Sequence, residues 1–329
     1  MKKIINNPEY IVRDMIDGMV AAFPNKLRKI EGTTVLVRKN APVEGKVGLI
    51  SGGGSGHEPA HGGYIGRGML DAAVAGEVFT SPSPDQIFQA IKAVDSGKGV
   101  FMIIKNYTGD VINFEMASEM AEAEGISVRK VIVNDDVAVE DSTATTGRRG
   151  VAGTVFVHKL VGATAEKGCS LDEVKRIAEL AVKNVRSMGI ALTPCIMPVS
   201  GEPGFEIDEN EMGVGIGIHG EPGIEHRKMV QADKIAEILV DKVLDEKIFT
   251  DDVAVMVNGM GATPEMELFI LNNRVQELLL EKGLNVYRTF VGDYMTSMEM
   301  AGCSLTLLKL DEELKELLDY VSEAPAFKV

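Results

Sequence analysis

The stretch from Ser51 to Pro59 combines two features that chemistry on a small polar molecule needs. It reads Ser-Gly-Gly-Gly-Ser-Gly-His-Glu-Pro and follows the apolar segment Lys46–Ile50. Glycine lets backbone N–H groups crowd around a ligand, because no Cβ keeps the ligand away. A histidine, here His57, can donate, accept or carry a proton near neutral pH. The run therefore predicts a strand that ends in a small-molecule pocket. The alternative is a tight turn with a solvent-facing histidine.

Two further segments place reactive side chains at predicted strand ends. Lys105 and Asp110 lie at or just past the end of the apolar run Val100–Ile104, which is typical of a strand buried on both faces. His219 stands beside Gly, Glu and Pro, as His57 does. In open α/β sheets, ligands bind outside the carboxyl ends of the strands. We therefore expect these four side chains to converge on one pocket.

Each of these residues also has a structural alternative. Asp110 precedes an apolar helical run, so it could be a helix N-cap. Lys105 could extend its ammonium group from a strand end into solvent, and His57 or His219 could be a hydrogen-bonded turn residue. Three other histidines have weaker contexts and are interpreted as structural or solvent-exposed: His61, His158 and His226.

The sequence shows no evident nucleotide site. The glycine run lacks the Gly-Lys-Ser/Thr ending that holds the phosphates of a nucleotide in a P-loop. A second glycine-rich run, residues 212–223, alternates glycine with aliphatic residues and fits a closely packed strand better than a phosphate cradle. Arg148 and Arg149, in a polar stretch over residues 134–149, could bind phosphate or form a surface turn.

Alternating strand and helix patterns predict the elements that position these residues. In the first half, strands are expected at 34–38, 46–51, 70–78, 100–104 and 128–133, and helices from 83, at 111–124, 150–167 and 171–188. In the second half, strands are expected at 191–199, 253–257, 285–291 and 304–309, and helices at 230–245 and 264–282. The fold class is thus α/β, with two α/β domains of parallel or mixed sheets flanked by helices. The expected boundary divides the chain into 1–188, with the glycine-rich pocket, and 189–329.

Composition narrows the class of protein. A chain of 329 residues with 45% hydrophobic and 25% charged residues is typical of a soluble globular protein with a large core. Its net charge of −15 disfavours nucleic acid and anionic membranes as partners. No apolar segment approaches the roughly 20 residues of a membrane helix, and none resembles a signal peptide. The scattered cysteines, Cys169, Cys195 and Cys303, indicate free thiols in a reducing cytoplasm.

Six ordered segments together resemble one known family, the dihydroxyacetone-binding K subunits of bacterial dihydroxyacetone kinases. The resemblance runs from about residue 7 to about residue 325. The segments are Ser51–Glu58, Phe79–Pro82, Lys105–Asp110, Thr146–Gly150, Gly217–Gly223 and Asn258–Pro264.

The resemblance implies a role for each matching residue. The family's covalent histidine matches His219, in the second domain, whose imidazole nitrogen would add to the ketone carbon of dihydroxyacetone and form a hemiaminal. Asp110 matches the residue proposed to take the proton from the attacking hydroxyl, and His57 matches a second histidine also described as a proton acceptor. Which of the two is the base stays open. Lys105 and the backbone of Gly54, Ser55 and Gly56 match further substrate contacts.

The resemblance also implies partners. Because the chain has neither a P-loop nor room for a nucleotide domain, it is similar to the type with separate subunits. In that type no cofactor binds this chain. ADP or ATP with Mg is held by a nucleotide-binding L subunit, and an M subunit relays phosphate from the phosphoenolpyruvate phosphotransferase system. A cytoplasmic homodimer is expected. The alternative is a catalytically inactive paralogue that senses dihydroxyacetone and acts as a transcriptional coactivator.

Overall fold

The computed structural model describes residues 2–140 and 146–329, and its strands and helices fall into two compact units. The first unit comprises Lys2–Val133, Val157–Val182 and Leu314–Val329. The second comprises Asn134–Phe156 and Lys183–Glu313. The units are therefore interleaved along the chain, and the single boundary near residue 188 stays a prediction. Part of the predicted 134–149 loop, residues 141–145, lies outside the described residues.

The first unit is built on a mixed sheet. Within the described residues its six strands lie in the order β1-β2-β4-β3-β5-β6, with β4, β3, β5 and β6 parallel to one another. The strands are β1 (Leu27–Lys29), β2 (Val35–Arg38), β3 (Gly48–Ser55), β4 (Ala72–Val78), β5 (Val100–Lys105) and β6 (Val128–Val133). The helices that lie wholly or mostly in this unit are α1 (Ile11–Ala22), α2 (Pro84–Val94), α3 (Thr108–Ala123), α4 (Thr154–Glu166), α5 (Leu171–Asn184) and α8 (Glu312–Asp319).

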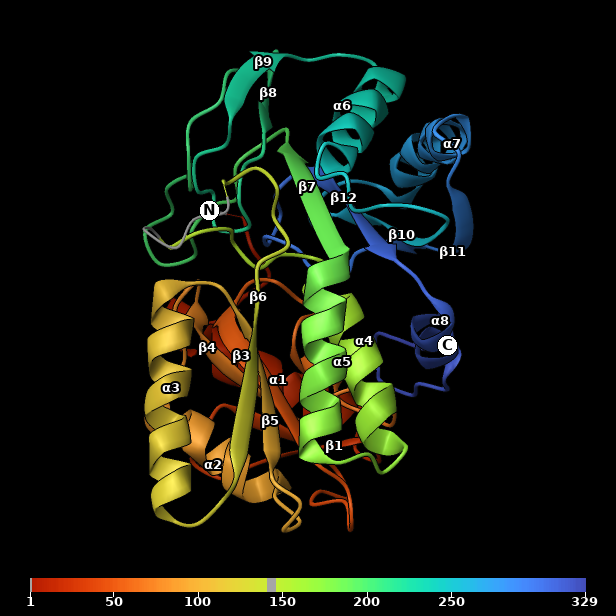
Figure 1. Ribbon diagram of the computed structural model, residues 1–329. Helices are drawn as coiled ribbons and strands as arrows, with labels where there is room; N and C mark the ends of the chain where they lie inside the picture. Colours follow the sequence, from red (N-terminus) through yellow and green to blue (C-terminus); the bar gives the residue numbers. More distant parts are fainter. Residues whose placement is uncertain (1, 141–145) are drawn as a thin grey trace. The chain divides into compact units, whose positions relative to one another are not determined.

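Helices cover both faces of this sheet, as predicted. Figure 1 shows α2 and α3 on one side of β3, β5 and β6, and α4 and α5 on the other. The apolar positions of α2 repeat at helical spacing, and Ile87, Ile91 and Val94 are buried against the sheet together with Phe114 of α3. This packing fixes the carboxyl ends of β3 and β5, where the candidate residues lie.

The last segment of the chain, residues 314–329, completes the first unit by packing on residues 63–68. The Ala326 amide donates to the Gly63 carbonyl over 2.9 Å, and the Glu323 amide donates to the Arg67 carbonyl over 3.0 Å. A Cβ on Gly68 would lie 2.3 Å from the Val321 carbonyl oxygen, so glycine permits this close approach.

The second unit contains another mixed sheet. Its six strands, among the described residues, lie in the order β11-β10-β12-β7-β8-β9, and only β10 and β11 are parallel. The strands are β7 (Val185–Ala191), β8 (Glu211–Val214), β9 (Glu225–Lys228), β10 (Asp252–Gly259), β11 (Asn285–Gly292) and β12 (Gly302–Lys309). Helices α6 (Ala232–Leu244) and α7 (Glu265–Glu281) bury their apolar stripes in the same core as β7, β10 and β12. The predicted fold class is confirmed.

Two predicted elements around residue 188 were wrong. The helix predicted to reach 188 ends at Asn184, and β7 then pairs with β12. Gly189 lies at the predicted domain boundary, but a Cβ there would lie 3.1 Å from Met260 Cε, so this glycine makes room for packing inside the strand. The strand predicted over 191–199 is absent: among described residues 192–199, only an isolated bridge at Ile196 remains. Pro194 and Pro198 cannot donate to a sheet ladder.

The described residues bear on the cysteines and on membrane-spanning helices. The three cysteines form no disulfide among them, and burial raises the pKa of the Cys303 thiol to about 12. No described helix is both long and apolar enough to cross a membrane.

Candidate active site

The glycine run forms the carboxyl-terminal end of β3, which is buried along its whole length. A Cβ on Gly54 would lie 2.6–2.7 Å from backbone atoms of Phe79 and Thr80, so only glycine allows this approach. The Ser55 hydroxyl donates to the Gly76 carbonyl over 2.7 Å, which ties the end of β3 to β4. The run therefore brings bare backbone to the end of the strand, as the sequence predicted.

His57 follows β3 and is fully buried, so the alternative of a solvent-facing turn histidine is wrong. Its ring stacks on the Phe79 ring, with a centroid separation of 5.1 Å and an interplanar angle of 15°. Phe79 has a positive φ of 53°, a conformation that is uncommon for a large side chain. The stack fixes the plane of the imidazole at the end of the glycine run.

Lys105 and Asp110 meet at the α-carbon of Gly53. A Cβ on Gly53 would lie 3.3 Å from Lys105 Nζ and 3.4 Å from Asp110 Oδ2. Lys105 ends β5 and is fully buried, so it does not extend into solvent; its ammonium also lies 5.5 Å from the centroid of the Tyr107 ring. Asp110 is not an N-cap, since α3 begins at Thr108 after Tyr107. Lys105 and Asp110 therefore lie together beside the glycine run, as expected, and the convergence of all four side chains on one pocket stays a prediction.

Ser81 holds the Asp110 carboxylate in place. Its hydroxyl donates to Asp110 Oδ1 over 2.5 Å, whereas Oδ2 is the oxygen near Gly53. A Cβ on Gly109 would lie 2.7 Å from Ser81 Oγ, so the preceding glycine makes room for this bond. Ser81 lies in one of the six segments that resemble the family, but the sequence alone indicates no role for it. A serine has no distinctive spacing to Asp110 that would have revealed the contact.

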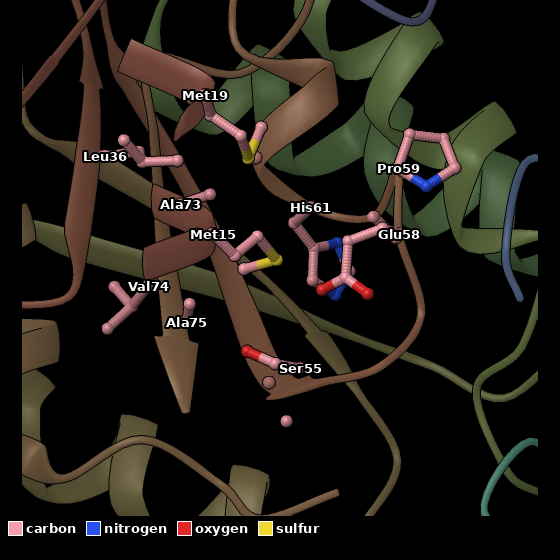
Figure 2. Close-up of a pocket in the computed structure, with 14 residues that line it drawn as sticks. Met15, Met19, Leu36, Ser55, Glu58, Pro59, His61, Ala73, Val74 and Ala75 are labelled. Carbon is pink, nitrogen blue, oxygen red and sulfur yellow. The ribbon is translucent and has the colours of Figure 1, made fainter. Parts of the chain in front are cut away.

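Glu58 contacts the backbone at the end of the glycine run. Both of its carboxylate oxygens accept from the Gly56 amide at 3.1 Å. Burial raises the pKa of this carboxyl, while hydrogen bonds and the charge of Lys105 oppose the rise. Figure 2 shows Glu58 and His61 beside a small cavity that Met15 also lines. The cavity measures about 20 Å³, enough for roughly one water-sized molecule.

His61 and His158 form a buried pair. Nδ1 of His61 lies 2.9 Å from Nε2 of His158, and both rings are over 90% buried. Burial and the nearby charge of Lys105 lower the pKa of His61 and bring that of His158 to about 3. Both are therefore neutral at pH 7 and fill the core. The prediction that His61, His158 and His226 are structural or solvent-exposed agrees with these positions, since His61 and His158 are buried and His226 is exposed.

His219 lies in the second unit, in the loop between β8 and β9. The strand expected over 212–223 ends at Val214, because Gly215 adopts a φ of +78°, a conformation that favours glycine and ends the extended backbone. His219 Nδ1 lies 2.6 Å from Glu221 Oε1, and the His219 amide donates to Glu221 Oε2 over 2.9 Å. Burial would raise the pKa of Glu221, but its bonds to His219 lower it to about 2.

Arg149 clamps the loop that carries His219. Its guanidinium donates to the Gly215 carbonyl over 2.7 Å and to the Pro222 carbonyl over 3.5 Å, at the two ends of the loop. It also pairs with Asp136 at 2.7 Å, and burial raises the pKa of that carboxyl to about 6 although Arg149 opposes the rise. The alternative of a surface turn is therefore wrong for Arg149, and phosphate binding by Arg149 stays a prediction.

Arg148 is also held by protein groups. Its guanidinium donates to both carboxylate oxygens of Glu246 at 2.8 Å and to the Val139 carbonyl at 3.2 Å. Its side chain is only 11% exposed. The alternative of a simple surface turn is therefore wrong for Arg148 as well.

The chemistry that these groups permit is nucleophilic addition and proton transfer. The first unit offers a carboxylate, an ammonium and an imidazole around bare backbone, and the second offers an imidazole held by a carboxylate. Among the described residues, no group of three or more His, Cys, Asp or Glu side chains could hold a metal ion.

Comparison with known proteins identifies close relatives. The Dak1 domain family matches residues 17–326. The dihydroxyacetone-binding subunit DhaK of the PTS-dependent dihydroxyacetone kinase 1 of Listeria innocua is 55% identical over 315 residues, covering 95% of each chain. The dihydroxyacetone kinase of C. freundii in complex with AMP-PNP and Mg²⁺ matches with a TM-score of 0.93 and 36% identity, covering 99% of this chain and 61% of that one. A dihydroxyacetone kinase operon co-activator, Dha-DhaQ, matches with a TM-score of 0.90 and 40% identity over 95% of this chain and 97% of that one.

Proposed function

The chain belongs to the Dak1 family, and we propose that it is the dihydroxyacetone-binding subunit of a phosphoenolpyruvate-dependent dihydroxyacetone kinase, a phosphotransferase that works with partner subunits. The observation that carries the proposal is the meeting of Lys105 and Asp110 at Gly53, in the glycine run that leads to the buried His57. This grouping has the donors and acceptors that a small polyhydroxy ketone requires. The 55% identity to a kinase subunit, against 40% to a co-activator, favours the enzyme over the sensing paralogue.

In this proposal His219 captures the substrate. A neutral imidazole nitrogen donates its lone pair to the ketone carbon of dihydroxyacetone, the C=O π pair moves to oxygen, and that oxygen takes a proton to give a hemiaminal. Glycerol has no carbonyl carbon and cannot form this bond. The covalent step therefore separates trioses from polyols by reactivity, where a pocket for such similar molecules would discriminate poorly by size. It also immobilises the substrate, which lowers the entropic part of the barrier.

In this proposal the first unit prepares a terminal hydroxyl of dihydroxyacetone for phosphorylation. The Lys105 ammonium and the backbone of Gly54, Ser55 and Gly56 donate hydrogen bonds to substrate oxygens. Asp110 Oδ2 or His57 accepts the proton of the attacking hydroxyl. A positioned general base of this kind contributes roughly 10²- to 10⁴-fold to the rate.

We assign the phosphoryl donor to the partner proteins. The phosphoryl group would come from ATP, held with Mg on a nucleotide-binding L subunit, and Mg would neutralise charge on the phosphate oxygens. The M subunit would supply phosphate to the L subunit indirectly. This chain would act as a homodimer in the cytoplasm, without nucleic acid or membrane partners.

Reconstitution tests the function. The chain is mixed with dihydroxyacetone and an L subunit that carries ATP and Mg, and dihydroxyacetone phosphate is measured. We expect product only when both proteins are present. Capture of the triose without any phosphorylation, under conditions where a known DhaK subunit is active, would instead identify a sensing paralogue.

Covalent capture is tested separately with dihydroxyacetone labelled with ¹³C at the ketone carbon. Binding should replace the ketone signal by the signal of a protein-bound tetrahedral carbon, and His219→Ala should abolish it. His226→Ala, in the same unit, is the matched control. Asp110→Asn should keep the tetrahedral signal and lose most of the turnover. A bound tetrahedral signal that survives His219→Ala would rule out this nucleophile.

A further inference from the structure

The side chain of Glu221 contacts His219 twice, once at the imidazole ring and once at the backbone amide. One carboxylate oxygen of Glu221 lies 2.6 Å from the ring nitrogen Nδ1 of His219, and the other accepts from the backbone amide of His219 at 2.9 Å. We infer that Glu221 is a positioning residue that fixes the His219 imidazole in the tautomer protonated on Nδ1, so that Nε2 is the nitrogen that attacks the ketone. This inference rests on the proposed function.

The tautomer follows from the chemistry of the two partners. Burial raises the pKa of the Glu221 carboxyl, but hydrogen bonds and electrostatic attraction from His219 bring it to about 2, so the carboxyl is ionised at neutral pH. An ionised carboxylate can only accept hydrogen bonds, so Nδ1 must be the donor. A neutral imidazole has a single N–H, which leaves the lone pair on Nε2.

The backbone of the loop holds the Glu221 carboxylate at the position from which it accepts the hydrogen bond of His219 Nδ1. The Gly217 amide donates to the Glu221 carbonyl over 3.0 Å, which folds the loop back on itself. A Cβ on Gly217 would lie 2.1 Å from Glu221 Oε2. A side chain at 217 would therefore displace the carboxylate, and glycine is needed for its present position.

The same contact assists the covalent step. When the Nε2 lone pair forms the N–C bond, the ketone π pair moves to oxygen, and the ring becomes an imidazolium that still carries its Nδ1 proton. Water protonates the new alkoxide. The positive charge forms next to the Glu221 carboxylate, and hydrogen bonds to charged groups are the strong ones. Glu221 thus selects the nucleophilic nitrogen and stabilises the charge that the addition creates.

A looser pair in the same unit provides the control. His226 Nδ1 lies 3.9 Å from Glu211 Oε2, beyond hydrogen-bond distance, and the two side chains are 43% and 34% exposed. Glu211→Gln removes a carboxylate beside a histidine just as Glu221→Gln does. Glu211→Gln should change neither the tautomer of His219 nor the capture of the triose, because this substitution removes no hydrogen bond to a histidine.

The tautomer can be observed without any substrate. Long-range ¹H–¹⁵N correlation NMR distinguishes a protonated imidazole nitrogen from one with a free lone pair. The chain has five histidines, so each ring can be assigned by single substitution. In the wild-type protein, the neutral His219 ring should carry its proton on Nδ1 and not on Nε2. In Glu221→Gln it should become a mixture of tautomers, and in Glu211→Gln it should not change.

Capture of the ¹³C-labelled triose provides the second measurement. Glu221→Gln should slow hemiaminal formation by about 10- to 100-fold, the range expected when a charge-assisted hydrogen bond is lost. Gly217→Ala keeps the Glu221 carboxylate but moves it away from its present position. This substitution should therefore also slow hemiaminal formation. Glu211→Gln should capture at the wild-type rate.

The outcomes separate the inference from the proposed function. A wild-type His219 protonated on Nε2 would overturn the inference whatever the capture rate, and this result does not depend on the folding of any variant. An unchanged tautomer and capture rate in Glu221→Gln would also overturn it. If the wild-type ring is protonated on Nδ1 in a Glu221-dependent way but no triose is captured, the positioning role stands and the proposed function fails.

Discussion

Replacing Gly54 by alanine should harm both the stability of the first unit and its proposed activity, for one geometric reason. The added Cβ would meet the Thr80 amide nitrogen at 2.6 Å and two backbone carbons of Phe79 at 2.7 Å. Carbon atoms pack best at about 3.5–4.0 Å, so β3 and residues 79–80 would have to separate by about 1 Å. All three obstructing atoms are backbone, which cannot rotate away as the end of a side chain could.

The magnitude can be bracketed from similar steric changes. Inserting a methyl group into a well-packed region costs typically about 1–3 kcal/mol, and the rigid contacts place Gly54→Ala near the upper end, about 3 kcal/mol. Gly18→Ala is the matched control, because a Cβ there meets nothing within 4 Å inside α1. That substitution should stabilise the protein by about 0.5–1 kcal/mol through the helix preference of alanine.

Urea unfolding and activity together test this reasoning. Gly54→Ala should unfold at lower urea than the wild type, and Gly18→Ala at slightly higher urea. Because the displaced Phe79 carries the ring that stacks on His57, turnover with the L subunit should also fall in Gly54→Ala and stay normal in Gly18→Ala. If Gly54→Ala unfolds at the wild-type urea concentration, the steric argument is refuted.

Three further predictions concern other contacts. Ser81→Ala should slow phosphorylation by about 10- to 100-fold but leave triose capture intact, because the Asp110 carboxylate loses the charge-assisted bond that orients it; equal losses in both steps would contradict this. Arg149→Met should lower the free energy of unfolding by about 3 kcal/mol, because Asp136 stays buried without its cation; a loss below about 1 kcal/mol in urea unfolding would contradict it. Burial holds the pKa of His158 at about 3, against an ordinary 6.5, so the unfolded chain binds more protons between these values. Stability should therefore fall as the pH drops from 6.5 towards 3, by up to about 1.4 kcal/mol per pH unit from this group, and His158→Asn should reduce that slope in unfolding curves at pH 7 and pH 4.5.

The elements that carry the pocket could be predicted from sequence because their signals are local. The apolar run before Lys105 and the glycine run after Ile50 each mark a strand end, and parallel strands bring their carboxyl ends to one edge of the sheet. The convergence of Lys105 and Asp110 beside Gly53 follows from that rule alone. The likeness of the segments around His57 and His219 led us to select both imidazoles from their glycine-rich neighbourhoods, and their roles stay predictions.

The rest depends on contacts between distant segments, which one sequence does not display. Gly189 looked like a domain boundary, because the packing of Met260 against it is invisible in the local pattern. Arg149 lies 66 positions before Gly215, so its clamp on the loop has no periodic signal. The contact of Glu221 with His219 is the exception, since the spacing of two residues in the same loop would have suggested it.

The segment over residues 314–329 has a consequence for how the protein is made and how it can be dissected. It covers residues 63–68 of the same unit, where Gly63, Gly66 and Gly68 have no side chain that would block its close approach. During translation, we expect the packing of the first unit to stay incomplete until these late residues leave the ribosome. For the same reason, a recombinant fragment ending at 188 would expose that glycine-lined surface and would need residues 314–329 added in trans or grafted through a linker.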